Sequence, residues 1–411
     1  MTKMQIKKID GGVCAAAGYK ANGLHCGIRA GSDPQKKDLA LIVSEKKAAA
    51  AAVYTTNKVK GAPIAVTRDH IADGYAQAVI CNSGNANTCN ADGIEIAESM
   101  SKLAAEAAGL TPQDIIVGST GVIGAPMSLE PVRAKIKELA DGLSKDGHLA
   151  AAEAIMTTDT VSKEAAVAFE IGGKTCHIGG MAKGSGMIHP NMATMLVFLT
   201  SDAAITPEML KQALRADIQD TFNMISVDGD TSTNDTVAIM ANGMAENSII
   251  DKEGEDYELF YAALHAVMSD LCRRIAKDGE GAEKLLTCRV AGAKSKENAR
   301  VVAKVIICSS LVKTAMAGGD ANWGRVLCAI GYSEAEVDVN KVELSFRSGG
   351  GEICVCSDGA GIPFSEEEAA RVLASDEIDI LVDLHDGAGE AVAWGCDLTH
   401  GYISINADYR T

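Results

Sequence analysis

One stretch of the chain, from Lys183 to Asp202, reads K-G-S-G-M-I-H-P-N-M-A-T-M-L-V-F-L-T-S-D. Its first half combines glycines and a proline with polar side chains, which predicts a loop. Its second half contains an apolar run from Met195 to Leu199, which predicts a buried strand. Thr194 lies where the loop passes into the strand. A threonine at the first position of a buried strand, approached through a glycine-rich loop, is where a self-processing nucleophile is expected.

The position of Thr194 allows a chemical interpretation. In a self-processing protein, its hydroxyl would attack the carbonyl carbon of Ala193, and water would then release a new amino terminus at Thr194. That α-amine, which ordinarily has a pKa of about 7.7–8.0, could serve as the base for the hydroxyl of the same residue. The alternative is a glycine-rich hairpin that leads into an ordinary core strand, and the pattern alone favours this alternative.

A resemblance adds to this interpretation. The segment K-G-S-G-M-I-H-P-N-M-A-T-M-L is similar to the processing-site signature of the ornithine acetyltransferases, the glutamate N-acetyltransferase family of arginine biosynthesis. Further similar segments follow the family order: T-T-N-K, S-T-G, M-T-T-D, D-G-E-G and the closing tail. The resemblance implies cleavage between Ala193 and Thr194, which gives an alpha-chain segment 1–193 and a beta-chain segment 194–411.

Composition excludes several classes of protein. The 411 residues suffice for two core-forming halves, and 47% of them are hydrophobic. A net charge of −17 without a long basic cluster argues against nucleic-acid binding. No apolar run reaches the ~18–20 residues of a membrane span, and the first ten residues lack the apolar core of a secretion signal. Twelve cysteines, most in apolar stretches such as those of Cys81, Cys308 and Cys328, suggest reduced thiols and a cytoplasmic protein.

Hydrophobic periodicity predicts alternating strands and helices. Residues 48–52, all alanine, are left open between helix and buried strand. Together the elements indicate a layered α/β architecture with mixed sheets. The resemblance implies an αββα sandwich of the DmpA and ornithine acetyltransferase type. We expect strands at 39–43, 78–81, 115–117, 164–171, 174–178, 195–199, 237–240, 285–290 and 402–406, and helices at 94–108, 129–140, 148–156, 206–220, 257–277 and 299–312.

Thr120 and Gly121 follow the predicted strand 115–117 within a G-S-T-G loop. A glycine-rich loop at the end of a strand leaves backbone N–H groups free, and these can stabilise an oxyanion. The alternative is an ordinary strand-ending turn. In the family that the chain resembles, a threonine–glycine pair in a matching S-T-G segment forms the oxyanion hole, and this implies the same role for Thr120 and Gly121.

The resemblance also implies the substrate-binding residues. A cation such as Lys183 suits a carboxylate, and an anion such as Glu280 suits an ammonium group, as an amino-acid substrate requires. Considered alone, Lys183 is interpreted as a surface-loop lysine and Glu280 as a solvated helix end. The full implied set is Thr157, Lys183, Thr194, Glu280, Asn406 and Thr411.

No metal or cofactor is expected. The eight histidines form no H-x-x-x-H pair, no C-x-x-C is present, and no phosphate-binding or dinucleotide fingerprint occurs. His189, beside the implied cut, is interpreted as part of the loop structure and not as a base.

The resemblance implies a ping-pong acetyl transfer without a cofactor. Thr194 would take the acetyl group from N2-acetyl-L-ornithine and pass it to L-glutamate, and many members of the family also use acetyl-CoA as donor. The implied assembly is a heterotetramer of two alpha and two beta chains. Two alternatives remain: an N-terminal-nucleophile aminopeptidase of the same fold, in which water is the acceptor, and a non-catalytic binding protein with an uncut chain.

Overall fold

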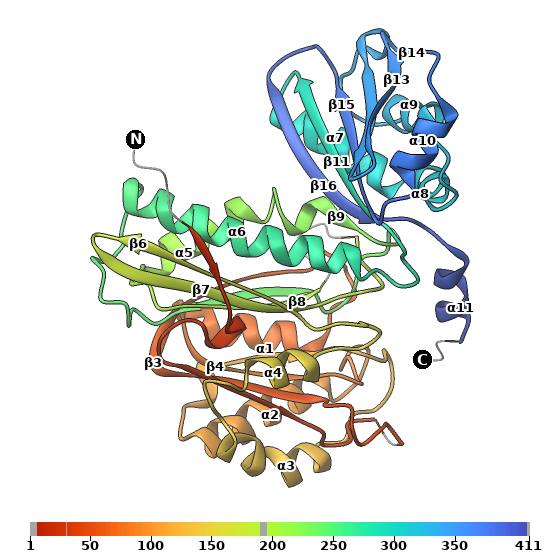
Figure 1. Ribbon diagram of the computed structural model, residues 1–411. Coiled ribbons are helices and arrows are strands. Elements are labelled where there is room, and N and C mark those ends of the chain that lie inside the picture. The colour runs from red at the N-terminus through yellow and green to blue at the C-terminus, as the bar shows by residue number, and fades with distance from the viewer. Residues whose placement is uncertain (1–5, 30, 190–194, 409–411) are drawn as a thin grey trace.

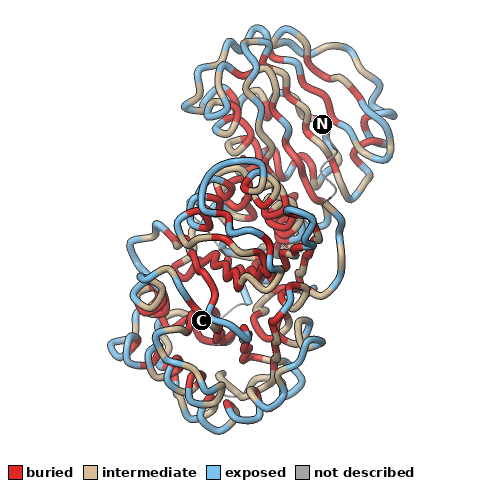
Figure 2. The backbone as a smooth tube through the Cα atoms, turned by 90° about the vertical axis from the view of Figure 1, so that its left-hand side faces the viewer, coloured by how far each residue is buried: buried red, intermediate tan, exposed pale blue. Residues whose placement is uncertain are grey.

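The computed structural model describes residues 6–29, 31–189 and 195–408 (Figure 1). The predicted site residues Ala193, Thr194 and Thr411 lie outside these ranges. The described chain forms two units, each built around one mixed β-sheet (Figure 1). In Figure 2 the buried segments concentrate inside both units, and exposed loops surround them. The described chain therefore contains two cores, and the first sheet takes strands from both sides of position 193.

Nine strands form the first sheet, in which parallel and antiparallel neighbours are mixed. Their spatial order is β1 (Lys7–Ile9), β6 (Lys163–Ile171), β7 (Lys174–Lys183), β8 (Leu196–Ser201), β10 (Thr236–Ala241), β3 (Leu39–Tyr54), β4 (Tyr75–Asn82) and β5 (Ile115–Ser119), with β2 (Tyr19–Leu24) paired to β3. Strand β7 precedes position 193 and β8 follows it, and the two strands pair directly.

The alanines at 48–52 belong to strand β3. Because side chains alternate along a strand, Ala48 and Ala50 face one core cluster while Ala49 and Ala51 face another. Small side chains allow both faces of this strand to be covered closely. Strand β8 is buried on both faces in the same way, which explains its continuous apolar run.

Helices cover the outer faces of the first sheet, and the described helices of this unit are α1 (Ala62–His70), α2 (Gly93–Ala108), α3 (Glu130–Asp141), α4 (His148–Ala154), α5 (Pro207–Asp217) and α6 (Glu255–Lys277). The outer face of β6, β7, β8 and β10 packs against α5 and α6. The outer face of β4 and β5 packs against α1, α2 and α3. The inner face encloses a third apolar cluster together with α4. The two sheet layers are two parts of this one sheet, with β6, β7 and β8 in one and β4 and β5 in the other, and they face each other across the third cluster. The order of layers is helices, sheet, sheet and helices, and the predicted αββα sandwich is confirmed (Figure 1).

The second unit contains seven strands in the order β14 (Ala360–Gly361), β13 (Gly351–Ser357), β12 (Glu343–Ser348), β15 (Glu377–Asp383), β11 (Leu285–Ala293), β16 (Gly389–Cys396) and β9 (Ile225–Ser226). Its described helices are α7 (Lys296–Cys308), α8 (Ser310–Ala317), α9 (Trp323–Gly331) and α10 (Glu366–Leu373). Helix α7 packs on β11 and β16 and contributes much of a separate apolar core. Strand β9 links the two units, because it lies in this sheet but follows the first unit's α5 in sequence.

Two predicted elements are wrong. The expected helix 299–312 is two helices, because Ser309 has an extended backbone and its Oγ accepts a hydrogen bond from the backbone N–H of Val312, which starts α8 anew. The expected strand 402–406 lies in helix α11 (His400–Asp408), which has no sheet partner among the described strands. Its alternating apolar residues mimic a strand, but Ile403 is 65% exposed and packs in neither core.

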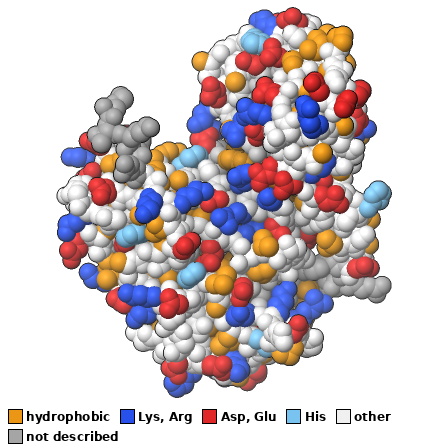
Figure 3. Space-filling view, viewed as in Figure 1, with side chains coloured by type: hydrophobic (Ala, Val, Ile, Leu, Met, Phe, Trp, Pro, Cys, Tyr) orange, Lys and Arg blue, Asp and Glu red, His pale blue; other side chains and the backbone are white. Residues whose placement is uncertain are grey.

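The remaining composition-based expectations concern thiols and charge. All twelve cysteines are free. Cys81 is buried as predicted, but Cys328 is exposed, because it lies on the outer side of α9, and Cys308 is only partly buried. On the face shown in Figure 3, acidic and basic side chains are intermixed and no continuous basic surface appears. Within the described ranges, no helix is both long and apolar enough to cross a membrane.

Candidate active site

A cavity of about 330 Å³ lies between the loops at one end of the first sheet and the chain that enters and leaves the second unit. It brings together all six predicted site residues that the structure describes. They come from segments far apart in sequence: Thr120 and Gly121 after β5, Thr157 after α4, Lys183 at the end of β7, Glu280 after α6, and Asn406 on α11.

The backbone around Thr120 and Gly121 is held in a defined conformation. Thr120 donates its N–H to the carbonyl of Asn82 at 3.0 Å. Gly121 has φ +127°, and a Cβ atom there would lie 2.5 Å from the carbonyl carbon of Gly84, so only glycine fits. No described group accepts a hydrogen bond from the N–H of Gly121. The loop therefore presents a free N–H beside a hydroxyl.

Lys183 is a buried cation in this cavity, since it is only 8% exposed. It ends strand β7, and its Nζ donates to the Oγ1 of Thr120 at 3.4 Å. The prediction from pattern alone, a solvated surface lysine, is therefore wrong. A buried ammonium next to the oxyanion loop can attract a substrate carboxylate.

Glu280 and Asn406 also line the cavity. The Nδ2 of Asn406 donates to the Oε2 of Glu280 at 2.8 Å, which attaches helix α11 to the cavity. The N–H of Glu280 donates to the carbonyl of Ser185 at 2.9 Å. Gly186 lies against the Glu280 carboxylate, because a Cβ atom at Gly186 would come within 2.3 Å of the carboxyl carbon.

A buried group of charges holds three of these segments together. Lys163 is fully buried, and its Nζ donates to Asp159 at 2.7 Å and to Asp278 at 2.5 Å. Asp159 also accepts from the N–H of Thr157 at 3.0 Å and from that of Gly184 at 2.7 Å. The ion cluster thus fixes the loop of Thr157, the turn after Lys183 and the end of helix α6 relative to one another.

The charge state of Asp159 is set by its neighbours. Burial alone would raise the pKa of this carboxyl, but the cations Lys183 and Lys163 and the hydrogen bonds from Lys163 and Gly184 outweigh it and lower the pKa to about 2. Asp159 is therefore ionised at neutral pH and forms an ion pair with Lys163.

The polar turn 231–235 contributes residues that the sequence prediction missed. Ser232, Thr233 and Asn234 line the cavity. The Nδ2 of Asn234 donates to the carbonyl of Ser119 at 2.9 Å and so supports the oxyanion loop from behind. A run of polar residues just before a buried strand is a signal that could have marked this segment, since strand ends often carry functional groups. The other missed lining residues are Ala86, Ile123, Thr158, Gly186 and Met187.

The chain before the predicted cut lines this cavity through Met187, and the chain after the cut lines a small neighbouring space. Met187 and Ile188 donate their N–H groups to Asp228 at 2.6 and 2.9 Å. Met195 and Leu196 line a small space of about 20 Å³ together with Thr120 and Lys183. The carbonyl of Met195 accepts from the N–H of Thr236 at 2.9 Å. The residue that follows Thr194 is thus adjacent to the oxyanion loop and the buried lysine.

His189 has contacts away from the cavity. Its Nδ1 lies 3.2 Å from the Oγ of Ser226 and 3.3 Å from the Sγ of Cys308. Burial, assisted by the nearby Lys304 cation, lowers the pKa of His189 to about 4, so the ring is neutral at pH 7. These contacts agree with a role in loop structure. Among the described residues, no group of three or more His, Cys, Asp or Glu side chains is placed to hold a metal ion.

Comparison with known proteins gives consistent matches. The model of the ArgJ family matches residues 20–411. The arginine biosynthesis bifunctional protein ArgJ of Caldanaerobacter subterraneus subsp. tengcongensis is 49% identical over 98% of this chain and 99% of that protein. The protein of the same name from Bacillus subtilis is 47% identical over 100% of this chain and 99% of that protein. A crystal structure of ArgJ from Bacillus halodurans is 48% identical, with a TM-score of 0.49, and covers 52% of this chain and 98% of that chain.

Proposed function

The chain belongs to the ArgJ family, and we propose from this premise that it is a glutamate N-acetyltransferase of arginine biosynthesis. It moves the acetyl group of N2-acetyl-L-ornithine to the α-amine of L-glutamate. The observation that carries this proposal is the cavity in which a buried lysine, a glutamate and an oxyanion loop meet. These groups match the carboxylate, the ammonium and the acetyl carbonyl of acetylornithine.

The nucleophile in this proposal is Thr194, released by self-cleavage after Ala193. The Thr194 hydroxyl attacks the carbonyl carbon of Ala193, the peptide bond becomes an ester, and water hydrolyses the ester. Residues 1–193 and 194–411 then form the alpha and beta chains. The pairing of β7 with β8 supports this division, because it would keep the two chains together after the cut.

In the first half-reaction, the Thr194 hydroxyl attacks the acetyl carbonyl carbon while its own α-amine takes the proton. The N–H of Gly121 and the hydroxyl of Thr120 stabilise the oxyanion of the tetrahedral intermediate. The bond between the acetyl carbon and the α-nitrogen breaks, ornithine leaves with the proton, and an acetyl-threonine ester remains. In the second half-reaction, the α-amine of L-glutamate attacks this ester and regenerates the hydroxyl.

The substrate is positioned by the remaining residues of the site. Lys183 binds the α-carboxylate, Glu280 binds the side-chain ammonium of the ornithine part, and Asn406 orients the Glu280 carboxylate. Thr157 completes the wall beside the acetyl group. Thr411 is assigned to the same site through the family resemblance.

We extend the proposal to the second donor, the assembly and the compartment. The relatives are named bifunctional, which supports acetyl-CoA as a second acetyl donor for glutamate. We further propose a heterotetramer of two alpha and two beta chains that works in the cytoplasm. Acetylation of glutamate by acetyl-CoA tests the second donor, and the native mass of the purified protein tests the assembly.

The reaction itself is tested by product analysis. Purified protein incubated with N2-acetyl-L-ornithine and L-glutamate should yield ornithine and N-acetylglutamate in equal amounts. Release of acetate in place of N-acetylglutamate would support the alternative of an aminopeptidase or amidohydrolase. If neither product formed, the proposed transferase activity would be contradicted.

A further inference from the structure

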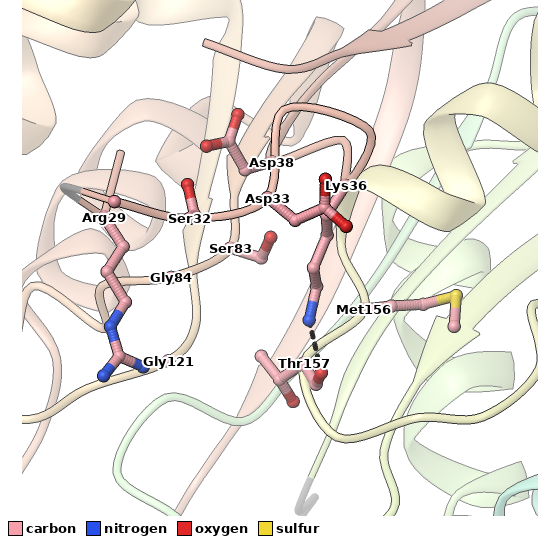
Figure 4. Close-up of a pocket in the computed structure, with 11 residues that line it drawn as sticks. Arg29, Ser32, Asp33, Lys36, Asp38, Ser83, Gly84, Gly121, Met156 and Thr157 are labelled. Atoms are coloured by element: carbon pink, nitrogen blue, oxygen red, sulfur yellow. Dashed lines mark hydrogen bonds between the residues drawn. The ribbon is translucent and has the colours of Figure 1, made fainter. Parts of the chain in front are cut away.

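A second cavity of about 400 Å³ adjoins the catalytic cavity and shares Gly121 and Thr157 with it (Figure 4). We call it the Arg29 cavity. Its other lining residues are Arg29, Gly31, Ser32, Asp33, Lys36, Asp38, Ser83, Gly84 and Met156. Because Gly121 carries the proposed oxyanion N–H, a ligand whose acyl group lies at Gly121 has access to both cavities.

Two cations of the Arg29 cavity lie near the place where the cavities meet. The Cβ atom of Arg29 is 3.5 Å from the position that a Cβ would take on Gly84, and Gly84 in turn packs against Gly121. Lys36 donates its Nζ to the carbonyl of Thr157 at 2.7 Å. In Figure 4 the Arg29 side chain points in the direction of Gly121, and the Lys36 side chain extends to Thr157.

The Arg29 guanidinium is available to a ligand. No hydrogen bond or ion pair joins it to any residue of the described ranges, and the side chain is exposed to solvent. Lys36 uses one of its three N–H groups on Thr157, which leaves two. Both cations therefore have donors to offer.

The carboxylates of the Arg29 cavity do not use these donors. Asp38 is buried and accepts the backbone N–H groups of residues 26–28 at 2.6, 2.9 and 2.8 Å. Asp33 is exposed, and its Oδ1 accepts from the N–H of Gln35 at 2.9 Å. Each carboxylate thus serves the loop in which it lies.

The two substrates of the proposed reaction pose opposite electrostatic demands. Both place their α-nitrogen at the acetyl carbon of Thr194, but acetylornithine has a side-chain ammonium and glutamate has a side-chain carboxylate. The ammonium suits Glu280. A second carboxylate at Glu280 would be repelled by it, since like charges in a partly buried site are unfavourable. Rotation about the bond between the α-nitrogen and Cα redirects the glutamate side chain without moving the reacting atom.

We propose that the Arg29 cavity binds the side-chain carboxylate of the acceptor glutamate, through Arg29 and Lys36. Both substrates then place their α-nitrogen at the same acetyl position. The side-chain ammonium of the donor points toward Glu280, and the side-chain carboxylate of the acceptor points toward Arg29. This inference rests on the proposed acetyltransferase function and assigns its acceptor specificity.

The test measures each half-reaction separately in the wild-type protein and in the Arg29→Gln variant. Exchange of labelled ornithine into N2-acetyl-L-ornithine requires only the first half-reaction, and we expect it to change less than about twofold. Transfer to L-glutamate requires the second, and we expect KM for glutamate to rise about 10- to 100-fold, the usual effect of losing a charge-assisted hydrogen bond. Wild-type protein should prefer L-glutamate to L-glutamine as acceptor, and Arg29→Gln should reduce this preference by the same factor.

A control variant and two outcomes decide the inference. Lys37→Gln removes a neighbouring cation that pairs with Glu153 outside the Arg29 cavity, and it should leave both half-reactions unchanged. An unaltered KM for glutamate in Arg29→Gln, or equal losses in exchange and transfer, would overturn the assignment. Absence of ornithine exchange in the wild-type protein would instead contradict the proposed function itself.

Discussion

Replacement of Thr120 by valine removes one hydroxyl from the oxyanion loop and keeps the shape of the side chain. Loss of one such donor lowers kcat by about 10²–10³-fold, which corresponds to about 2.7–4 kcal/mol of transition-state stabilisation. The Thr120 hydroxyl is 3.4 Å from the Nζ of Lys183, a long contact that contributes little to substrate binding. We therefore expect the loss to fall on kcat, with KM for N2-acetyl-L-ornithine changed less than about threefold.

The assay measures ornithine release in a single turnover, together with the cleaved fraction by mass spectrometry. Cleaved Thr120→Val protein should release ornithine about 10²–10³-fold more slowly than wild type. Thr120→Ser retains the hydroxyl and should stay within about tenfold of wild type. Cleaved Thr120→Val protein with a wild-type rate would refute the oxyanion role, and so would a change confined to KM.

Three further substitutions test other contacts of the fold and the site. Gly186→Ala places a methyl group within 2.3 Å of the Glu280 carboxyl carbon, so KM for N2-acetyl-L-ornithine should rise, on the order of tenfold or more, with kcat less affected. Lys163→Met leaves two buried carboxylates without their cation, and urea unfolding should show a loss of about 3–5 kcal/mol, against less than about 1 kcal/mol for Lys137→Met at an exposed ion pair. His177→Gln should destabilise the protein more at pH 5.5 than at pH 8.5, as measured by unfolding at both pH values.

The sign of the last prediction follows from the ion pair between His177 and Asp202. The Nδ1 of His177 lies 2.7 Å from the buried Asp202 carboxylate, and this hydrogen bond raises the pKa of the histidine despite its partial burial. A raised pKa means that the folded state binds the proton more tightly than the unfolded state. The stabilisation is therefore complete below the unfolded pKa and is lost as the pH rises through the folded value. A larger effect of His177→Gln at pH 8.5 would contradict this reasoning.

The parts of the fold that depend on local pattern were predicted from the sequence. Strand β8 has a continuous apolar run and helix α2 stops at Gly109, which takes a left-handed conformation. The alanines of β3 could not be assigned from the sequence, because a run of five alanines is compatible with a helix and with a buried strand. The strand is favoured by packing, since the two faces of this segment contact two different apolar cores. Helix α11 was predicted as a strand because its apolar and polar residues alternate. A strand also needs a neighbouring strand to pair with, and the sequence pattern does not show whether one is present.

The site shows a similar limit. Thr120, Lys183 and Glu280 were singled out by motifs that resemble a family, and pattern alone favoured structural roles for all three. The ion cluster around Lys163 was missed, since residues 159 and 278 meet only in the folded chain. Arg29 was missed for the same reason: its nearness to Gly121 arises from the packing of two loops, through Gly84.

The central claim is that Thr194 becomes an amino-terminal nucleophile that carries the acetyl group. The most direct measurement is the intact mass of the purified protein, quenched after mixing with N2-acetyl-L-ornithine alone, beside the Thr194→Ala variant. We predict two wild-type fragments, residues 1–193 and 194–411, with the mass of one acetyl group added to the second, and a single unmodified chain in the variant. One uncut, unacetylated chain in the wild type would contradict the claim.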